Sequence, residues 1–236
     1  QYGKAEQYDI PEEPKEQYEA EPEVQLYQRQ AMKKLLSVDT EDAFELGTET
    51  GTGNSFGISL EKNSRIFVVN PKNKKEILTL FAERLSEKGR KVHIYSKERA
   101  TESGEETVIT DIDAFTWTYE ASDDILIVDG FADLYDEISD EALDELIRVI
   151  KNHPEKQIIT LDTMERIKDY CDTELYLLLV KCNAGIVLGG KADNDIAVLL
   201  NTDFYTMPEE YRKIELHDNQ AIVYERDMAA YVQIGG

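Results

Sequence analysis

One stretch of the chain joins a short apolar run to an amphipathic pattern, and this pairing limits the folds that are open to it. Residues 65–69 read Arg-Ile-Phe-Val-Val, which predicts a buried strand. In residues 74–88, Ile77, Phe81 and Leu85 recur at every fourth position and therefore lie on one face of a helix. Because a buried strand followed at once by a helix is the unit of βαβ folds, we expect a parallel sheet flanked by helices.

The loop between this strand and this helix stands where a P-loop ATPase binds phosphate. A phosphate loop needs glycine, so that backbone N–H groups can converge on the phosphates, and a Ser or Thr to hold Mg²⁺. This loop has no glycine, and Glu76 stands where the Ser or Thr is expected. A carboxylate there suits the helix dipole but competes with a bound anion. We expect the following positions to be vestigial nucleotide-binding positions: Asn70, Pro71, Lys74, Lys75 and Glu76.

A second apolar run, residues 125–128, ends in Asp129 and is followed by Gly130. In a working ATPase this is the Walker B motif, in which one acid supports Mg²⁺ and the next polarises the attacking water. Gly130 has no titratable group and cannot act as that general base. The plainer alternative is that Asp129 ends a buried strand and caps the next segment. The order of the two motifs favours a nucleotide site that has lost its catalytic residues.

The composition excludes several classes of partner. The chain has 236 residues, of which 41% are hydrophobic, enough for one large α/β domain. Its net charge of −23 disfavours nucleic acid, because Lys and Arg make the phosphate contacts, and it disfavours anionic lipid. A solvated acidic surface explains the charge itself. The three histidines are scattered and the two cysteines form no CxxC motif, so we expect no metal site.

The first part of the chain differs from the rest. Residues 1–25 are acidic and carry three of the six prolines, a composition that cannot build a core. Residues 24–36 predict a short helix. We therefore expect an acidic linker or arm at 1–39 and a folded domain at 40–236. The chain begins with Gln1 and not with Met, which indicates a piece of a longer protein and leaves room for membrane segments upstream.

Strands and helices alternate along the predicted domain, and its tail is richer in strands. Strands are predicted at 65–69, 92–95, 107–109, 125–128, 157–161 and 185–188. Helices are predicted at 74–88 with Gly89 as its stop, at 111–119, at 140–151 with Ser139 as its N-cap, and within 164–182. Segment 44–60 predicts turns that lead into a strand. The tail predicts hairpins from 212–216, 221–224 and 231–234, with Asp218-Asn219 as a turn.

Five stretches occur in an order typical of one ATPase family: 44–63, the pair Asn70-Pro71, 127–130, 185–190, and 219–234 with its Val-Gln-Ile ending. In these stretches residues 40–236 resemble FtsK/SpoIIIE-type ATPase domains. They are most similar to the third, C-terminal ATPase domain of the EssC/YukB/EccC membrane ATPases of type VII secretion. The resemblance implies an α/β fold of the P-loop NTPase class (RecA/FtsK-like), with a mostly parallel sheet flanked by helices and with C-terminal β-hairpins.

The chain departs from the family's motifs at its nucleotide positions. Lys75 aligns only loosely with the Walker lysine, and Lys74 is the other candidate. Asp162-Thr163 stands where related translocases carry Thr-Gln. The resemblance implies that such degenerate terminal domains contribute to substrate recognition and not to turnover. We therefore expect no catalytic residue and no bound cofactor.

The resemblance also implies a location and partners for the domain. It places the domain at the cytoplasmic face of the cell membrane, as a soluble part of a longer membrane protein. The implied partners are secreted proteins with helical export signals and neighbouring ATPase domains of the same chain.

Two other functions stay open from the sequence. One is an active P-loop ATPase with an unusual phosphate loop, which would bind ATP and Mg²⁺. The other is a DNA translocase domain, which the fold permits and the net charge of −23 disfavours. The missing phosphate-loop glycines, Mg²⁺ hydroxyl and catalytic acid favour the silent module, because phosphoryl transfer depends on positioning and electrostatics.

Overall fold

The fold was examined in a computed structural model, which describes residues 43–50, 52–69, 74–97, 107–113, 124–182, 184–191, 215–225 and 228–235. The chain divides into two compact units, Gln1–Leu35 and Leu36–Gly236, and every described residue belongs to the second. The predicted arm at 1–39, with its short helix, therefore lies outside the described residues.

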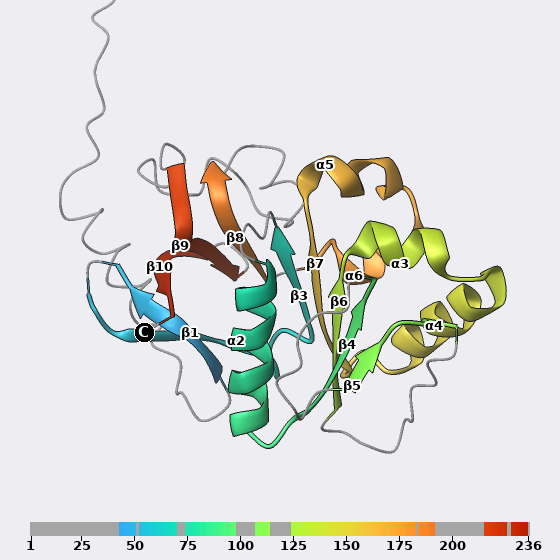
Figure 1. The fold of residues 1–236 in the computed structure, drawn as a ribbon, viewed down its shortest axis with the longest axis horizontal. Coiled ribbons are helices and arrows are strands. Elements are labelled where there is room, and N and C mark those ends of the chain that lie inside the picture. The colour runs from blue at the N-terminus through green and yellow to red at the C-terminus, as the bar shows by residue number, and fades with distance from the viewer. Residues whose placement is uncertain are drawn as a thin grey trace, which may run out of the picture. The chain divides into compact units, whose positions relative to one another are not determined.

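A single ten-stranded sheet organises the second unit, in the order β2-β1-β10-β9-β8-β3-β7-β6-β4-β5 (Figure 1). Six neighbouring strands run parallel: β3 (Arg65–Val69), β4 (Lys91–Ser96), β5 (Thr107–Ile109), β6 (Asp124–Asp129), β7 (Gln157–Asp162) and β8 (Ala184–Lys191). The other four extend the sheet antiparallel from β8: β9 (Glu215–Glu225), β10 (Met228–Ile234), β1 (Ala43–Glu49) and β2 (Ser55–Ser59). The predicted α/β class with a mostly parallel sheet is confirmed.

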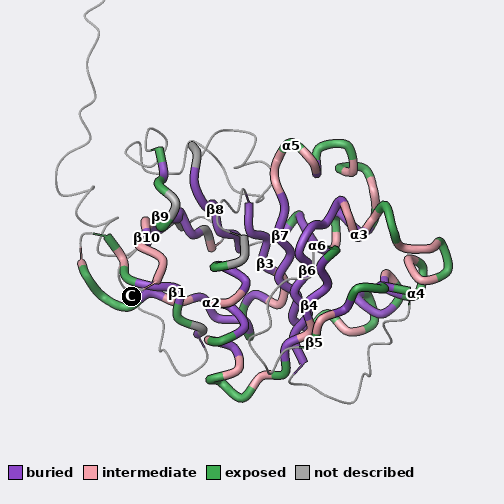
Figure 2. Tube along the Cα trace, in the orientation of Figure 1, coloured by how far each residue is buried: buried purple, intermediate pink, exposed green. Residues whose placement is uncertain are grey.

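Helices pack on both faces of the sheet, and the alternation of side chains along the strands decides which face each helix covers. Ile66 and Val68 cluster with buried residues of α2 (Lys74–Glu87), while Phe67 and Val69 cluster on the opposite face. That second cluster holds residues of the other α-helices in the described part of the chain: α3 (Phe131–Glu137), α4 (Asp140–Asn152), α5 (Met164–Ile167) and α6 (Glu174–Leu179). Figure 2 shows the strands buried between these two layers.

Two helix boundaries have the chemistry that the sequence predicts. The Ser139 hydroxyl accepts a hydrogen bond from the Ala142 N–H and caps α4. After α2, Gly89 adopts φ +73° and the Arg90 N–H donates to the Leu85 carbonyl, which closes the helix in a left-handed turn. Both predictions are confirmed.

Two predictions about strands and turns were wrong. Asp218-Asn219 is not a hairpin turn, because it lies inside β9, at an irregular step in its pairing with β8. At this step residues 217–220 of β9 lie opposite the single residue Gly189 of β8, and Gly189 has a φ of +73°. Segment 44–60 contains two strands, β1 and β2, and not turns before a single strand. Of the helix predicted at 111–119, residues 111–113 are irregular and the rest lie outside the described residues.

Candidate functional site

The carboxyl ends of four parallel strands meet at one edge of the sheet and form the candidate site. Ser96 ends β4 beside Asp129, Asp129 pairs with Leu161, and Asp162 ends β7 beside Val69. β3 and β7 are neighbours in the sheet. The connection after β3 leads to β4 on one side of this pair, and the connection after β7 leads to β8 on the other side. Adjacent strands whose connections run in opposite directions mark the place where α/β folds bind ligands. Val69 ends β3 and Asp129 ends β6 at this edge.

The positions predicted in the phosphate loop are only partly described by the structure. Asn70 and Pro71 lie outside the described residues. The backbones of Lys74 and Lys75 form the start of α2, and their side chains are not described. Glu76 lies in the first turn of α2 and is exposed. A carboxylate therefore stands at the end of the helix where a nucleotide's phosphates would approach.

Asp129 is buried at the end of β6, with 2% of its surface exposed. The Ser96 hydroxyl donates a hydrogen bond to Asp129 Oδ2 over 2.7 Å. Asp129 has the same strand parity as Ile125 and Ile127, which pack on the α2 side of the sheet. Asp129 therefore lies on the same side of the sheet as the helix that follows the predicted phosphate loop.

Gly130 has a backbone conformation that favours glycine. Its φ is +98° and its ψ is 88°, and its N–H donates to the Leu161 carbonyl over 3.0 Å. A Cβ at this position would lie 2.6 Å from Asp133 Oδ2. The backbone angle and the neighbouring carboxylate both oppose a side chain at the position after Asp129.

An ion-paired cluster lies beside Gly130, between the ends of β6 and β7. Arg166 Nη2 lies 2.6 Å from Asp133 Oδ1, and Arg166 Nη1 lies 3.6 Å from Asp162 Oδ1. Asp162 also accepts hydrogen bonds from the Ala132 N–H, at 2.9 Å, and from the Thr163 N–H, at 2.7 Å. The bond to Asp133, aided by the charge of Asp162, raises the pKa of Arg166. Arg166 therefore stays charged and holds both carboxylates.

Sequence reasoning did not find this cluster as a unit. The sequence drew attention to Asp162 only as a departure from the family's Thr-Gln, although β7 ends in an acid just as β6 does. Arg166 lies four positions after Asp162, but its nearer partner, Asp133, lies 33 positions away on another helix.

The described residues contain neither a metal-binding cluster nor a membrane-spanning helix. No three His, Cys, Asp or Glu side chains among them are grouped so that they could hold a metal ion. No described helix is both long enough and apolar enough to cross a membrane.

The comparisons with known proteins give structural likeness and no sequence match. No protein-family model and no curated protein matches the chain. The cytoplasmic domain of EssC superimposes with a TM-score of 0.62 at 11% identity, covering 86% of this chain and 46% of that one. EssC (ATPases 2 and 3) of Geobacillus thermodenitrificans gives 0.60 at 9% identity, over 84% and 42%. The chain therefore spans less than half the length of these proteins.

Further likenesses come from secretion and from conjugation. EccC (ATPases 2 and 3) of Thermomonospora curvata, in complex with a signal sequence peptide, gives a TM-score of 0.58 at 11% identity, over 84% of this chain and 41% of that one. The pCW3 conjugation coupling protein TcpA with ATPγS gives 0.55 at 14% identity, over 85% and 67%. At such low identity these likenesses concern the fold. The chain has the fold of the FtsK-like ATPase domains found in the type VII secretion proteins EssC and EccC.

Proposed function

We propose that this chain is a cytosolic module of a type VII secretion ATPase, that it does not hydrolyse ATP, and that it contributes to recognising exported proteins. The observation that carries the proposal is the conformation of Gly130. A working ATPase has a catalytic acid after the Walker B aspartate, and here that position has a left-handed backbone, and a Cβ on it would lie 2.6 Å from Asp133 Oδ2. A glutamate at Gly130 would need both the backbone and the Asp133–Arg166 pair to rearrange.

The charges near this edge also favour a silent site. Asp129, Asp133 and Asp162 contribute three carboxylates near the strand ends, and Arg166 contributes the guanidinium that two of them already share. Glu76 adds a carboxylate in the first turn of α2, where phosphate oxygens would otherwise meet backbone N–H groups. These described residues fit MgATP poorly, and we derive no catalytic step through it.

A role in recognition is supported by what the structurally similar proteins are. EccC of Thermomonospora curvata has been solved in complex with a signal sequence peptide, and EssC and EccC carry ATPases 2 and 3 in one chain. We propose that exported proteins with helical signals and neighbouring ATPase domains are the partners of this module. A helical signal would lay its apolar face into a groove, with anchors at i, i+3 and i+4. The net charge of −23 disfavours DNA as the partner. The module would belong to a longer, membrane-anchored protein and face the cytoplasm.

The proposal is tested by comparing two changes in the full-length protein. Asp129→Ala should leave the set of secreted proteins unchanged and shift the melting temperature only modestly, because a vestigial acid has no turnover to support. Replacing residues 40–236 by the corresponding domain of a related protein should change which proteins are secreted. Loss of secretion in Asp129→Ala, with melting unchanged, would contradict silence. An unchanged set of secreted proteins after the swap would refute recognition.

A further inference from the structure

Helix α3, which follows Gly130, carries acidic side chains that are bonded to separate parts of the fold. Arg166 of α5 holds Asp133, with 2.6 Å between Nη2 and Oδ1. The Tyr170 hydroxyl, in the 3₁₀ turn η1 (Lys168–Tyr170), donates to Asp136 Oδ1 over 2.7 Å. That bond raises the pKa of Tyr170 to about 12, so its hydroxyl keeps its proton over the physiological range. Two successive turns of α3 are thus bonded to the α5–η1 segment.

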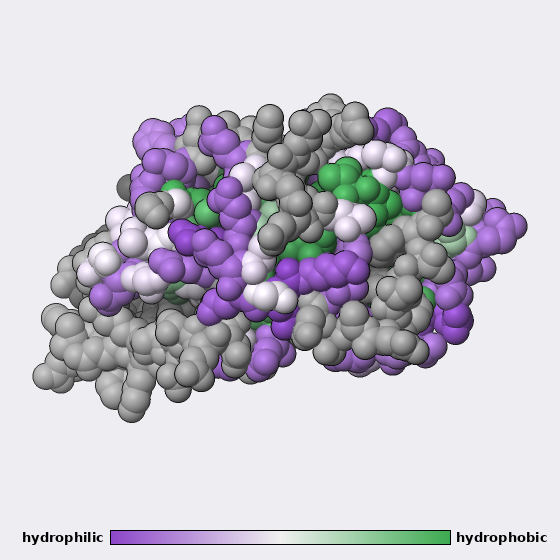
Figure 3. Space-filling view, turned by 60° about the horizontal axis from the view of Figure 1, so that its bottom comes forward, coloured by the Kyte–Doolittle hydropathy of each residue, from purple (hydrophilic) through white to green (hydrophobic). Residues whose placement is uncertain are grey.

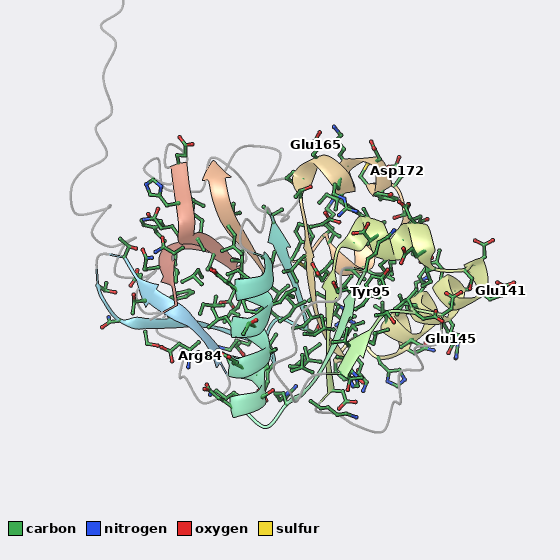
Figure 4. The ribbon with its side chains drawn as sticks, in the orientation of Figure 1. Arg84, Tyr95, Glu141, Glu145, Glu165 and Asp172 are labelled. Atoms are coloured by element: carbon green, nitrogen blue, oxygen red, sulfur yellow. The ribbon has the colours of Figure 1, made fainter. Side chains whose placement is uncertain are left out.

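The third acidic residue connects α3 to the sheet. The Tyr95 hydroxyl donates to Glu137 Oε2 over 2.8 Å, and Lys97 Nζ lies 2.6 Å from Glu137 Oε1. Tyr95 is fully buried in β4 (Figure 4). The bonds from Lys97 and Tyr95 lower the pKa of Glu137. Because Ser96 lies between these two residues and donates to Asp129, the end of β4 contacts both α3 and the end of β6.

The first turn of α3 is fixed as well. The Ala132 N–H donates to Asp162 at the end of β7, and the Phe131 ring is buried among aromatic rings. The centre of this ring lies 6.2 Å from that of Tyr135, and it meets the Tyr170 ring edge-on at 5.9 Å. Phe131 therefore packs against the same residue of η1 that bonds to Asp136.

Contacts outside α3 matter for its stability because the helix is short. It has seven residues, and helices below roughly 12–15 residues are marginal in water when isolated. Each exposed ion pair contributes little by itself, about 0–1 kcal/mol. The two ion pairs, to Arg166 and to Lys97, and the hydrogen bonds from Tyr170 and Tyr95 together connect α3 to α5, η1 and the end of β4, and so fix the position of the helix as well as its fold. A displacement of any one of these elements then acts on α3.

We propose that α3 is a coupling element, which transmits a displacement of the α5–η1 segment to the carboxyl ends of β4 and β6. The outer side of α5 and η1 is exposed, and Figure 4 shows Glu165 and the nearby Asp172 pointing away from the body of the domain. A partner that moves this surface segment would therefore act on the strand ends that carry Ser96 and Asp129. The inference does not depend on whether the domain hydrolyses ATP, because it concerns the structure without nucleotide.

The first test measures hydrogen exchange of the α3 amides in the nucleotide-free protein. The double change Arg166→Gln and Tyr170→Phe removes two bonds and keeps the rings that pack on Phe131. We expect the Leu134 and Ile138 amides, which bond within and just after α3, to exchange at least tenfold faster. Arg148→Gln is the matched control, because Arg148 forms an ion pair with Glu145, three positions before it on the exposed face of α4. Unchanged α3 exchange in the double variant would overturn the proposal and leave core packing as the sole restraint.

In the second test, the substitutions are in and just after β4, and the measurement is made on the residue that follows η1. Cys171 is exposed and directly follows η1, whereas Cys182 is buried, so a nitroxide label can be placed on Cys171 alone. The double change Tyr95→Phe and Lys97→Ala removes the bonds to Glu137. We expect this variant to increase the mobility of the label in its electron paramagnetic resonance spectrum, and Arg148→Gln to leave it unchanged. An unchanged spectrum in the β4 variant would refute transmission through α3.

Discussion

At the scale of single residues, the backbone angle of Gly130 and the carboxylate of Asp133 act on the same position. Left-handed backbone is open to glycine and costs other residues roughly 1–2 kcal/mol. At Gly130 a Cβ would also meet Asp133 Oδ2, which Arg166 restrains through the other oxygen. The two effects can be separated, because Gly89 has a similar positive φ and open space around it.

We predict that Gly130→Ala is more destabilising than Gly89→Ala. The Gly89 variant should lose roughly 1 kcal/mol, the strain of the left-handed backbone. The Gly130 variant should lose about 1–2 kcal/mol more, because the new methyl group displaces a carboxylate that is bonded to a charged group. Urea unfolding of both variants measures the difference. Equal losses would mean that Asp133 moves aside freely and that its carboxylate does not block the position.

Cys182 gives a pH-dependent prediction. The thiol is 7% exposed and donates to the Ala184 carbonyl, and burial raises its pKa to about 11. In the unfolded chain the pKa of a thiol is about 8.5. The stability that comes from burying the neutral Cys182 thiol is therefore complete below that pH and is lost as the pH rises toward 11. We expect the wild-type free energy of unfolding to fall by up to about 3 kcal/mol over this window. The Cys182→Ala variant should show a flatter profile, and equal slopes would refute the assignment.

At the scale of elements, the parts that could be predicted are those whose signals are local. The runs at 65–69, 125–128 and 157–161 form buried central strands, because each has enough apolar residues to be covered on both faces. The N-cap at Ser139 and the stop at Gly89 depend on short-range hydrogen bonds and were equally visible.

The elements that could not be predicted depend on pairing between distant segments. Asp218-Asn219 has the composition of a turn, but it lies between Leu216, which pairs with β8, and Gln220, which pairs with β10, so the strand continues on both sides of it. Gln220 and Gln233 also bond to the backbone of this irregular step. β1 follows the same logic only in part: β2 comes directly after it in the chain, but its other partner, β10, comes from the far end of the sequence. The same distinction holds for the candidate site. Asp129 and Gly130 could be predicted because they follow a buried strand, whereas the Asp133–Arg166 pair could not, because it joins two helices.

At the scale of the whole molecule, the chain has an ATPase-like fold, but the residues at the carboxyl ends of its parallel strands fit MgATP poorly. The fold is like that of the ATPase domains in EssC and EccC. The face shown in Figure 3 is hydrophilic over much of its described surface, with apolar side chains gathered in patches, in keeping with a net charge of −23. Because fold alone does not set function, the proposal of silence depends on the residues at the strand ends.

Titration calorimetry with MgATP, paired with a phosphate-release assay, tests the proposed silence most directly. Wild-type protein and Asp129→Ala are compared with a working P-loop ATPase that confirms both assays. We predict no saturable heat for either form of this protein, and phosphate release equal to the protein-free rate, because Gly130 supplies no base and Glu76 places a carboxylate in the first turn of α2. Micromolar binding, or turnover that disappears in Asp129→Ala, would contradict the account.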